Sequence, residues 1–449
     1  MSNTERGCPF DHSTLPPGTD GVPDLDETAE FMMNPGTFLS ERQAQFGNTI
    51  LSRVFGVPTV YMLSAEGNEW VYRGENKYVA SQWPIAFRRL LGENSIPMLT
   101  GAIHRERRRI VEPHFRFDHM AQFIPTIEAV AHKHLATWVE SDYVAIINKM
   151  REFAFEVINV FLFSDDLAKI DLAYMSQEFV LWTEGLFAVD MDESPDAPFG
   201  RALRAKDILQ EQIGKLVAER RASGEQKADI LGTYLTTQDS DGNFLTDAII
   251  VDELQNLLFA GHDTTVTSMS NLLLHLSQNP DVLAKAREEQ QAFDTAAPIS
   301  LNDLKAMPYL DAVIHESLRM IAPVRAMTRR VLENTQYEEY CIPKDYAVTI
   351  NCPVTHHDPE VWTEPEKFDP ERWFDPRSEQ KHKPFGFIAF GGGPRLCLGK
   401  NFALVEMRLM TALILRGYTW EVLPDQDLTH TVFPFPNVKS GLLASVSRL

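Results

Sequence analysis

Residues 390–399 read Phe-Gly-Gly-Gly-Pro-Arg-Leu-Cys-Leu-Gly, a glycine-rich run that leads to one cysteine, Cys397. Glycine lets a backbone approach a flat partner closely, and Pro394 stiffens the loop. The composition of residues 400–415 predicts a helix, so Cys397 would lie just before a helix N-terminus. Amide donors and the positive end of a helix dipole favour a thiolate there, which suits an anionic ligand to a buried iron. The alternative is a small cysteine buried in a tight turn.

Composition limits the kind of protein that surrounds this loop. The chain has 449 residues and is 44% hydrophobic, so it can bury a large core. Length alone fits about three domains or one large helical enzyme. No apolar run is long enough to span a bilayer, and the formal net charge of −21 argues against nucleic acid or an anionic membrane as the general partner. We therefore expect a soluble protein.

The cysteines and the N-terminus indicate an intracellular protein. No C-x-x-C spacing occurs, so neither a disulfide framework nor a zinc site is expected, and Cys8, Cys341 and Cys352 have no predicted chemistry. Residues 1–20 are polar and lack the basic start and apolar core of a signal peptide. We expect a polar, proline-rich lead-in over residues 1–24, a single catalytic domain over residues 25–449, and a cytoplasmic location.

A second informative stretch lies in a long helix predicted over residues 246–278. Gly261 in its middle costs about 1 kcal/mol against alanine, and Thr264 can donate to the carbonyl of Ala260, so the backbone hydrogen bonding could open there. In such an opening, the Thr264 hydroxyl and the Asp263 carboxylate would be the parts of a proton relay. The alternative is an ordinary helix interior with a threonine cluster. We interpret His262 as a packing residue.

Two further sets of charged residues have informative spacing. His104 and Arg108 lie four apart on a predicted helix, where two donors can meet two carboxylates of one ligand, although a solvated helix face has the same spacing. Glu316 and Arg319 lie three apart on another helix, and Arg372 follows in a proline-bounded segment. These three charges can meet, and removing one partner of such a buried group typically costs about 3 to 5 kcal/mol.

Together these stretches resemble the cytochrome P450 family, whose motifs occur in the family's order over nearly the whole chain. They are H-x-x-x-R at 104–108, A-G-x-D-T-T at 260–265, E-x-x-R at 316–319, P-E-R-W at 370–373 and F-x-x-G-x-R-x-C-x-G at 390–399. The resemblance implies a mainly α protein with a small β-rich lobe that holds haem b.

The resemblance also assigns roles to residues. It implies that Cys397 is the proximal iron ligand, and that Asp263 and Thr264 are the catalytic acid and alcohol. The residues expected to bind haem are His104, Arg108, Ala260, Arg329, Phe390, Arg395, Cys397 and Gly399. The arginines and His104 would bind the propionates, and Phe390 would pack beside the sulfur. The structural triad would be Glu316, Arg319 and Arg372.

The reaction that the resemblance implies is hydroxylation, because a thiolate ligand favours O–O cleavage. No flavin or iron–sulfur module is appended, so electrons would come from a ferredoxin or flavodoxin with its NAD(P)H-dependent reductase. A peroxide-driven peroxygenase or an isomerase could dispense with the Asp263–Thr264 pair, which argues against both. A haem-thiolate sensor is the alternative that is not an enzyme.

The substrate is expected to be hydrophobic, such as a retinoid, fatty acid, terpenoid or sterol-like molecule. The expected substrate contacts are Trp83, Phe87, Phe259, Val324, Arg325, Met327 and Phe433, with an irregular segment over residues 83–100 as the roof of the cavity. Leu-Leu-Gly at 90–92 and Phe-Ala-Gly-His at 259–262 are most similar to the retinoic-acid-hydroxylating branch. Arg325 could hold a substrate carboxylate or pair with a protein carboxylate.

One basic segment stands out in this acidic chain and predicts the docking surface of an acidic electron carrier. The arginines of residues 88–109 are Arg88, Arg89, Arg105, Arg107, Arg108 and Arg109, against Glu93 and Glu106. If Arg108 turns inward to a propionate, Arg105 and Arg109 lie on another helical face and can form an exposed patch. The alternative is a solvated arginine-rich helix.

Overall fold

The structure is a computed structural model that describes residues 14–19, 26–188, 190–294 and 297–449, and its chain forms two compact units. Unit one combines the chain up to Gln82 with His315–Cys397, and unit two combines Trp83–Ile314 with Leu398–Leu449. Most of the predicted lead-in, Cys8 included, lies outside the described residues. The expectation of a single domain over residues 25–449 stays a prediction.

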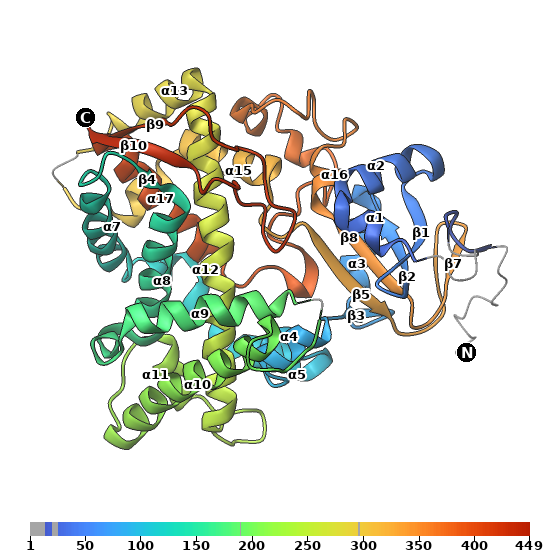
Figure 1. Ribbon diagram of the computed structural model, residues 1–449, viewed down its shortest axis with the longest axis horizontal. Helices are drawn as coiled ribbons and strands as arrows, with labels where there is room; N and C mark the ends of the chain where they lie inside the picture. Colours follow the sequence, from blue (N-terminus) through green and yellow to red (C-terminus); the bar gives the residue numbers. More distant parts are fainter. Residues whose placement is uncertain (1–13, 20–25, 189, 295–296) are drawn as a thin grey trace. The chain divides into compact units, whose positions relative to one another are not determined.

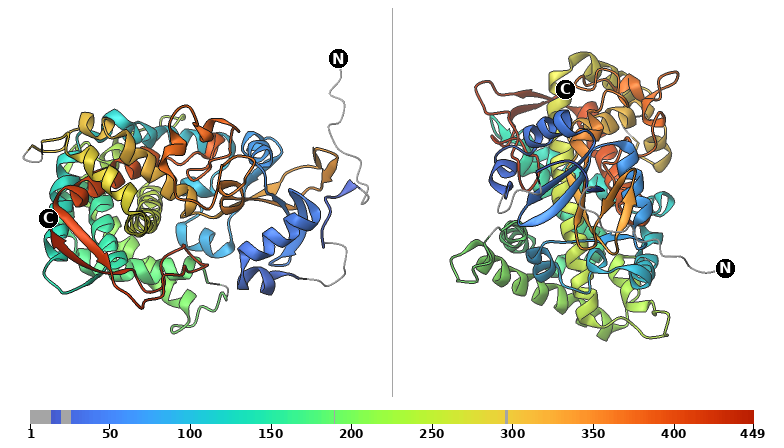
Figure 2. Two further views of the ribbon diagram at one scale, coloured as in Figure 1. Left: turned by 90° about the horizontal axis from the view of Figure 1, so that it is seen from above. Right: turned by 90° about the vertical axis from the view of Figure 1, so that its right-hand side faces the viewer.

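Unit one is built on a five-stranded sheet in the order β1-β2-β8-β5-β3. Its strands are β1 (Thr49–Val54), β2 (Val57–Met62), β3 (Val79–Ser81), β5 (Ala326–Val331) and β8 (Ala347–Asn351). β1 and β2 pair as an antiparallel hairpin, and their β-branched residues favour such strands. In Figure 2 the early strands (blue) and the late strands (orange) of this sheet lie side by side.

Short helices and a small hairpin complete unit one. The helices are α1 (Thr28–Met33), α2 (Pro35–Phe46), α3 (Ala65–Gly74) and α16 (Cys352–His356), and the hairpin pairs β6 (Thr335–Tyr337) with β7 (Tyr340–Ile342). Asn34 caps α2 by accepting a hydrogen bond from the Thr37 amide, 3.2 Å away, and Pro35 occupies the first helical position. α15 (Pro308–Met320) begins in unit two and ends in unit one.

Unit two is helical, and the long helix α12 (Asp247–Gln278) runs through it with α8, α9 and α10 around it (Figure 1). Thr246 caps α12 by accepting from the Ile249 amide, as its sequence position predicts. The helices before α12 are α4 (Ile85–Leu91), α5 (Gly101–Val111), α6 (Phe117–Met120), α7 (Ile124–Trp138), α8 (Ile146–Phe163), α9 (Leu172–Leu186), α10 (Pro198–Ser223) and α11 (Ile230–Thr236).

The rest of unit two follows α12. Its helices are α13 (Pro280–Gln290), α14 (Leu301–Lys305) and α17 (Lys400–Gly417), and its sheet has the order β4-β10-β9, formed by Val144–Ala145, Leu443–Arg448 and Tyr418–Val422. Among the described residues, no helix is long and apolar enough to cross a membrane.

The structure corrects one expectation about secondary structure. Residues 83–100 are not irregular throughout, because α4 occupies seven of them and a 3₁₀ turn follows at Ile96–Met98. Ala86, Phe87, Leu90 and Leu91 are buried. Their spacing puts apolar side chains on one face of a helix, a pattern that the prolines at either end obscured.

Candidate active site

The loop that carries Cys397 has a backbone conformation that depends on its glycines. Gly391 and Gly393 have φ of 70° and 58°, in the left-handed region where glycine is favoured. A Cβ on Gly393 would lie 2.7 Å from the carbonyl oxygen of Tyr72 in α3, and one on Gly392 would lie 2.8 Å from the Phe385 ring. The Cys397 amide donates to the Phe390 carbonyl at 2.8 Å and closes the loop. This loop presents Cys397 as an exposed residue.

The buried side chain of His356 is connected by hydrogen bonds to the start of the Cys397 loop. The Gly391 amide donates to the Ile388 carbonyl at 2.8 Å, and the Ile388 amide donates to Nε2 of His356 at 2.9 Å. Because Nε2 accepts, the ring proton is assigned to Nδ1, which donates to the Arg319 carbonyl at 3.1 Å. Burial lowers the pKa of His356 to about 3, so the ring is neutral and its tautomer is fixed by these two partners. The ring also stacks on Phe387, with centroids 5.1 Å apart.

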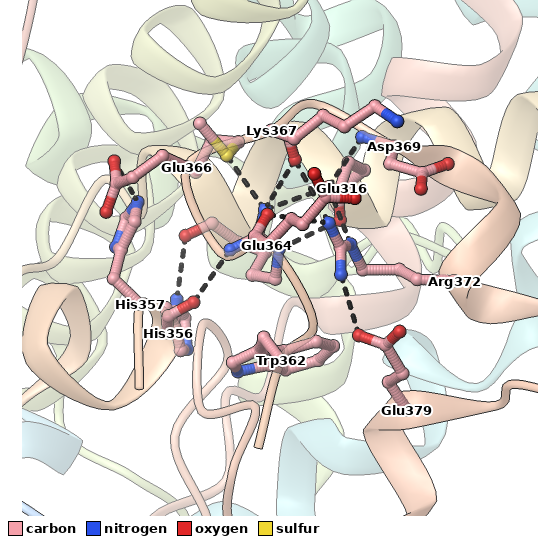
Figure 3. A network of polar contacts seen from close by, with 12 residues as sticks. Glu316, His356, His357, Trp362, Glu364, Glu366, Lys367, Asp369, Arg372 and Glu379 are labelled. Atoms are coloured by element: carbon pink, nitrogen blue, oxygen red, sulfur yellow. Dashed lines mark hydrogen bonds and ion pairs between the residues drawn. The ribbon is translucent and has the colours of Figure 1, made fainter. Parts of the chain in front are cut away.

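The side chains of the predicted charged triad form hydrogen bonds with one another near His356 (Figure 3). Glu316 accepts from Arg319 through both carboxylate oxygens at 2.9 Å and from Nε of Arg372 at 2.9 Å. All three side chains are fully buried. Arg372 also donates to Glu379 at 2.6 Å, and Nη1 of Arg319 donates to the His356 carbonyl at 2.7 Å. The triad is therefore connected by hydrogen bonds to the loop of Cys397, through a histidine that sequence reasoning missed.

A buried carboxylate, also missed, joins two of the arginines expected to bind propionates. Glu75 accepts from Nε of Arg329 at 2.6 Å and from Nε of Arg395 at 2.9 Å. The three side chains are less than 10% exposed. Two guanidinium groups thus share the Glu75 carboxylate in a place shielded from solvent. Guanidinium donors and an exposed thiol fit a ligand that brings both a carboxylate and a metal, as haem does.

In unit two, α12 departs from one expectation at its centre. Thr264 does donate to the Ala260 carbonyl, at 2.8 Å, but the helix is continuous and no opened turn interrupts it. Gly261 has a different role there. A Cβ at this position would lie 2.7 Å from Cδ1 of Ile158 in α8, so glycine lets α12 pack closely on this side chain as it stands.

The middle of α12 is nevertheless the place where this buried helix becomes accessible. Ala260 is exposed and Asp263 and Thr264 are partly exposed, whereas the turns on either side are buried. His262 packs, because its ring lies edge-on to Phe179 and Nε2 approaches the Arg151 carbonyl at 3.2 Å. Its Nδ1 lies 3.4 Å from the Asp263 carboxylate, whose side chain is 13% exposed. The acid and the alcohol predicted for proton transfer thus follow one another on the partly accessible stretch of α12, with the acid next to the packed histidine.

On α5, His104 is buried and Arg108 is half-buried, one helical turn apart. Arg107 is buried as well and pairs with the fully buried Glu253 of α12 at 3.1 Å. Glu253 also accepts from the Ile96 amide at 3.1 Å, and burial raises the pKa of this carboxyl to about 8. Arg107 therefore does not belong to an exposed basic surface. The sequence could have indicated this burial, because Arg107 lies four residues before the apolar Val111 and residues four apart share a helix face.

The two arginines of the basic segment that precede α5 are exposed, but both form ion pairs. Arg88 pairs with Glu93 at 3.0 Å and Arg89 with Glu193 at 2.6 Å, so their charges are partly compensated. The arginines of α5 that remain exposed are Arg105 and Arg109.

The predicted substrate residues fall in both units. In unit two, Phe87 lies between Trp83 and Phe259, with ring centroids 5.3 and 6.2 Å away. Phe433 is 43% exposed. Three further aromatic residues continue this cluster, namely Trp182, Phe187 and Phe435. In unit one, Val324 is 38% exposed, and Met327 accepts a hydrogen bond from the Tyr72 hydroxyl at 3.3 Å.

An exposed cysteine in a loop shaped by glycines, next to two arginines that share a buried carboxylate, is the arrangement expected of a haem-thiolate protein. The family model "Cytochrome P450" matches residues 16–440, and the chain belongs to this family. This confirms the expected class of enzyme, a cytochrome P450 monooxygenase with haem as its cofactor. Electron supply by a redox partner is typical of the family.

Particular relatives are similar over almost the whole chain. The chain is 32% identical over 435 residues to "Putative cytochrome P450 120" of Synechocystis sp., with 97% of each chain covered. It is 29% identical to abscisic acid 8'-hydroxylase 1 of Arabidopsis thaliana, covering 92% of this chain and 87% of the relative. A solved structure, retinoic acid bound cyanobacterial CYP120A1, matches with a TM-score of 0.90 and 32% identity over 97% of this chain and 99% of the other. The mainly helical fold with a small β-rich lobe is thereby confirmed.

Proposed function

We propose that the protein is a haem b monooxygenase that hydroxylates an apolar terpenoid or other lipid, with electrons from a separate ferredoxin or flavodoxin. The observation that carries the proposal is the loop of Cys397, whose two left-handed glycines and closing hydrogen bond present one sulfur. A cytoplasmic location is part of the proposal. Haem, when bound, supplies the site at which dioxygen is activated.

The residues proposed to hold the cofactor are those that match the family's motifs. Cys397 would bind the iron through its sulfur. Arg329 and Arg395 would bind propionates, and their guanidinium groups, which lie side by side on Glu75, support this role. His104 and Arg108 would bind the propionates from α5. Close packing against the flat ring is proposed for Ala260, Phe390 and Gly399.

Proton delivery is proposed for Asp263 and Thr264. The Thr264 hydroxyl donates to the Ala260 carbonyl in the structure, so its oxygen is free to accept a hydrogen bond from a ligand on the exposed side of α12. Asp263, one residue earlier, would pass protons from solvent to that hydroxyl. The partial exposure of both side chains supports this role.

The names of the relatives support a terpenoid substrate. One solved relative is described as bound to retinoic acid, and another relative is named for the hydroxylation of abscisic acid. The aromatic cluster around Phe87 supports an apolar ligand, because aromatic side chains bury large areas. Retinoids are therefore the first class to test, before fatty acids, other terpenoids and sterols.

The experiment that tests the proposal is the carbon monoxide spectrum of the ferrous protein, measured together with turnover. The wild-type protein should show the strongly red-shifted Soret band of a thiolate complex, and Cys397→Ser should lose it. Retinoic acid with NADPH, a reductase and a ferredoxin should yield a hydroxylated product. Retention of the red-shifted band in Cys397→Ser would refute the assignment, and haem binding without any turnover across the four substrate classes would favour a sensor.

A further inference from the structure

One face of strand β5 is directed at the loop of Cys397. Side chains alternate along a strand, so residues 325, 327 and 329 share a face. Arg329 on this face donates to Glu75, which also binds Arg395 of the loop. Met327 on the same face lies 3.8 Å, through its sulfur, from the place where a Cβ on Gly391 would be. Both contacts show that this face of the strand lies against the loop.

Arg325 belongs to that face although it precedes the strand by one residue. The last pair of the β5–β8 ladder is Ala326 with Asn351. Cys352 directly follows β8, and its amide donates a hydrogen bond to the Arg325 carbonyl at 2.8 Å. The antiparallel pairing therefore continues through Arg325. Its side chain therefore leaves the backbone on the side of Met327 and Arg329.

The guanidinium of Arg325 has no carboxylate partner among the residues that the structure describes. Its neighbours are different, since Arg329 pairs with Glu75 at 2.6 Å and Arg330 with Asp345 at 3.5 Å. Arg325 is also half-buried, and burial lowers the pKa of its guanidinium. The adjacent Cys352 offers no compensating charge, because burial raises the pKa of its thiol to about 12. Partly buried charges are normally paired, so the Arg325 guanidinium could accommodate an anionic partner from a ligand.

We infer that Arg325 binds the carboxylate of the substrate, and that the preferred substrate is therefore an apolar carboxylic acid. A guanidinium presents two parallel donors that match a carboxylate, and the exposed side chain of Val324 beside it is apolar. This inference rests on the proposed function and adds a substrate class and a residue that determines specificity. Arg325 and Met327 are about 7 Å apart along the extended chain. The carboxylate of the substrate would therefore lie about 7 Å along β5 from Met327, the residue that lies near the Cys397 loop.

The test compares each acid with its methyl ester in binding experiments on the haem-loaded protein. Dissociation constants are measured from the Soret shift for retinoic acid and methyl retinoate, and for palmitic acid and methyl palmitate. Wild type should bind at least one acid about tenfold or more tightly than its ester, the size expected for a charge-assisted hydrogen bond. Arg325→Leu should lose this preference while its affinity for the ester changes less than about twofold. Arg325→Lys should keep part of it.

Arg330→Leu is the matched control, because Arg330 is the exposed arginine of the opposite face and is already paired. It should leave the acid preference unchanged. Equal binding of acid and ester by wild type, binding of neither acid, or an acid preference that survives in Arg325→Leu would each overturn the inference. So would a loss of haem content in Arg325→Leu with the preference intact, since it would assign Arg325 to a propionate. Failure of the proposed function is separate, because it would appear as a missing thiolate band in wild type.

Discussion

Replacement of His356 by phenylalanine should weaken the support of the Cys397 loop without disturbing its packing. Phenylalanine keeps a planar ring to stack on Phe387 but can neither accept from the Ile388 amide nor donate to the Arg319 carbonyl. Each buried polar group left without a partner costs about 1 to 3 kcal/mol, so we expect the free energy of unfolding to fall by about 2 to 6 kcal/mol. That is a large share of the stability of a typical protein.

The assay follows urea unfolding with two probes. Far-ultraviolet circular dichroism reports the helices of the whole chain, and the carbon monoxide spectrum reports the thiolate ligand. In His356→Phe both transitions should move to lower urea, and the thiolate signal should be lost before the helices unfold, because Ile388 holds Gly391 at the start of the loop. His357→Phe is the matched control, since Nδ1 of the next histidine bonds to the Pro353 carbonyl and its Nε2 lies 3.9 Å from Glu366, away from Ile388 and Gly391.

The pH dependence gives an independent check. The native ring stays neutral because burial lowers the pKa of His356 to about 3, whereas the unfolded chain takes up a proton near pH 6.5. Wild type should therefore lose stability as pH falls from 6.5 towards 3, by up to about 5 kcal/mol from this group, and His356→Phe should lose less over that window. The reasoning is refuted if His356→Phe matches the control in urea midpoint, in the order of the two transitions and in pH profile.

Three further predictions concern unit two. Native Glu253 should keep its proton to about pH 8 whereas the unfolded carboxyl releases it near pH 4.5, so stability falls as pH rises through this window, and Glu253→Gln should flatten that fall in urea unfolding. Thr264→Ala should bind haem and substrate but divert NADPH electrons to peroxide, and Asp263→Asn should slow turnover, both measured as product and peroxide per NADPH. Arg105→Glu with Arg109→Glu should slow carrier-driven reduction and weaken its salt dependence, measured by stopped flow.

Each of these has a result that would contradict it. An unchanged pH profile in Glu253→Gln would mean that the native carboxyl is ionised throughout. Wild-type rate and coupling in both Thr264→Ala and Asp263→Asn would exclude the proton relay. For the arginine pair, dithionite reduction is the control, and carrier-driven reduction that is unchanged across a salt series would rule this surface out.

The sequence predicted the parts of the fold and the site that depend on local patterns. The long helix predicted over residues 246–278 and the bond from Thr264 to Ala260 follow from residues within four positions of each other. The meeting of Glu316 with Arg319 follows from helical spacing, and its extension to Arg372 needed the family pattern.

The parts that the sequence did not predict depend on residues that are distant in the chain. Glu75 meets an arginine 254 residues later and another 320 residues later, and no local window contains both partners. His356 reaches Ile388 and Arg319 across 32 and 37 residues, and its own segment looks like an ordinary turn. Such contacts arise only when the sheet and helices have packed, so hydrophobic periodicity carries no signal for them.

The contact between Gly261 and Ile158 has a consequence for which sequences this fold accepts. An alanine at 261 would be favoured by helix propensity by about 1 kcal/mol, yet its methyl group would enter the volume of the Ile158 side chain. The two positions are therefore coupled: alanine at 261 requires the end of the Ile158 side chain to move, and it should fit more easily when residue 158 is shortened, for example to valine or alanine. The size chosen at one position thus affects which sizes the other accepts.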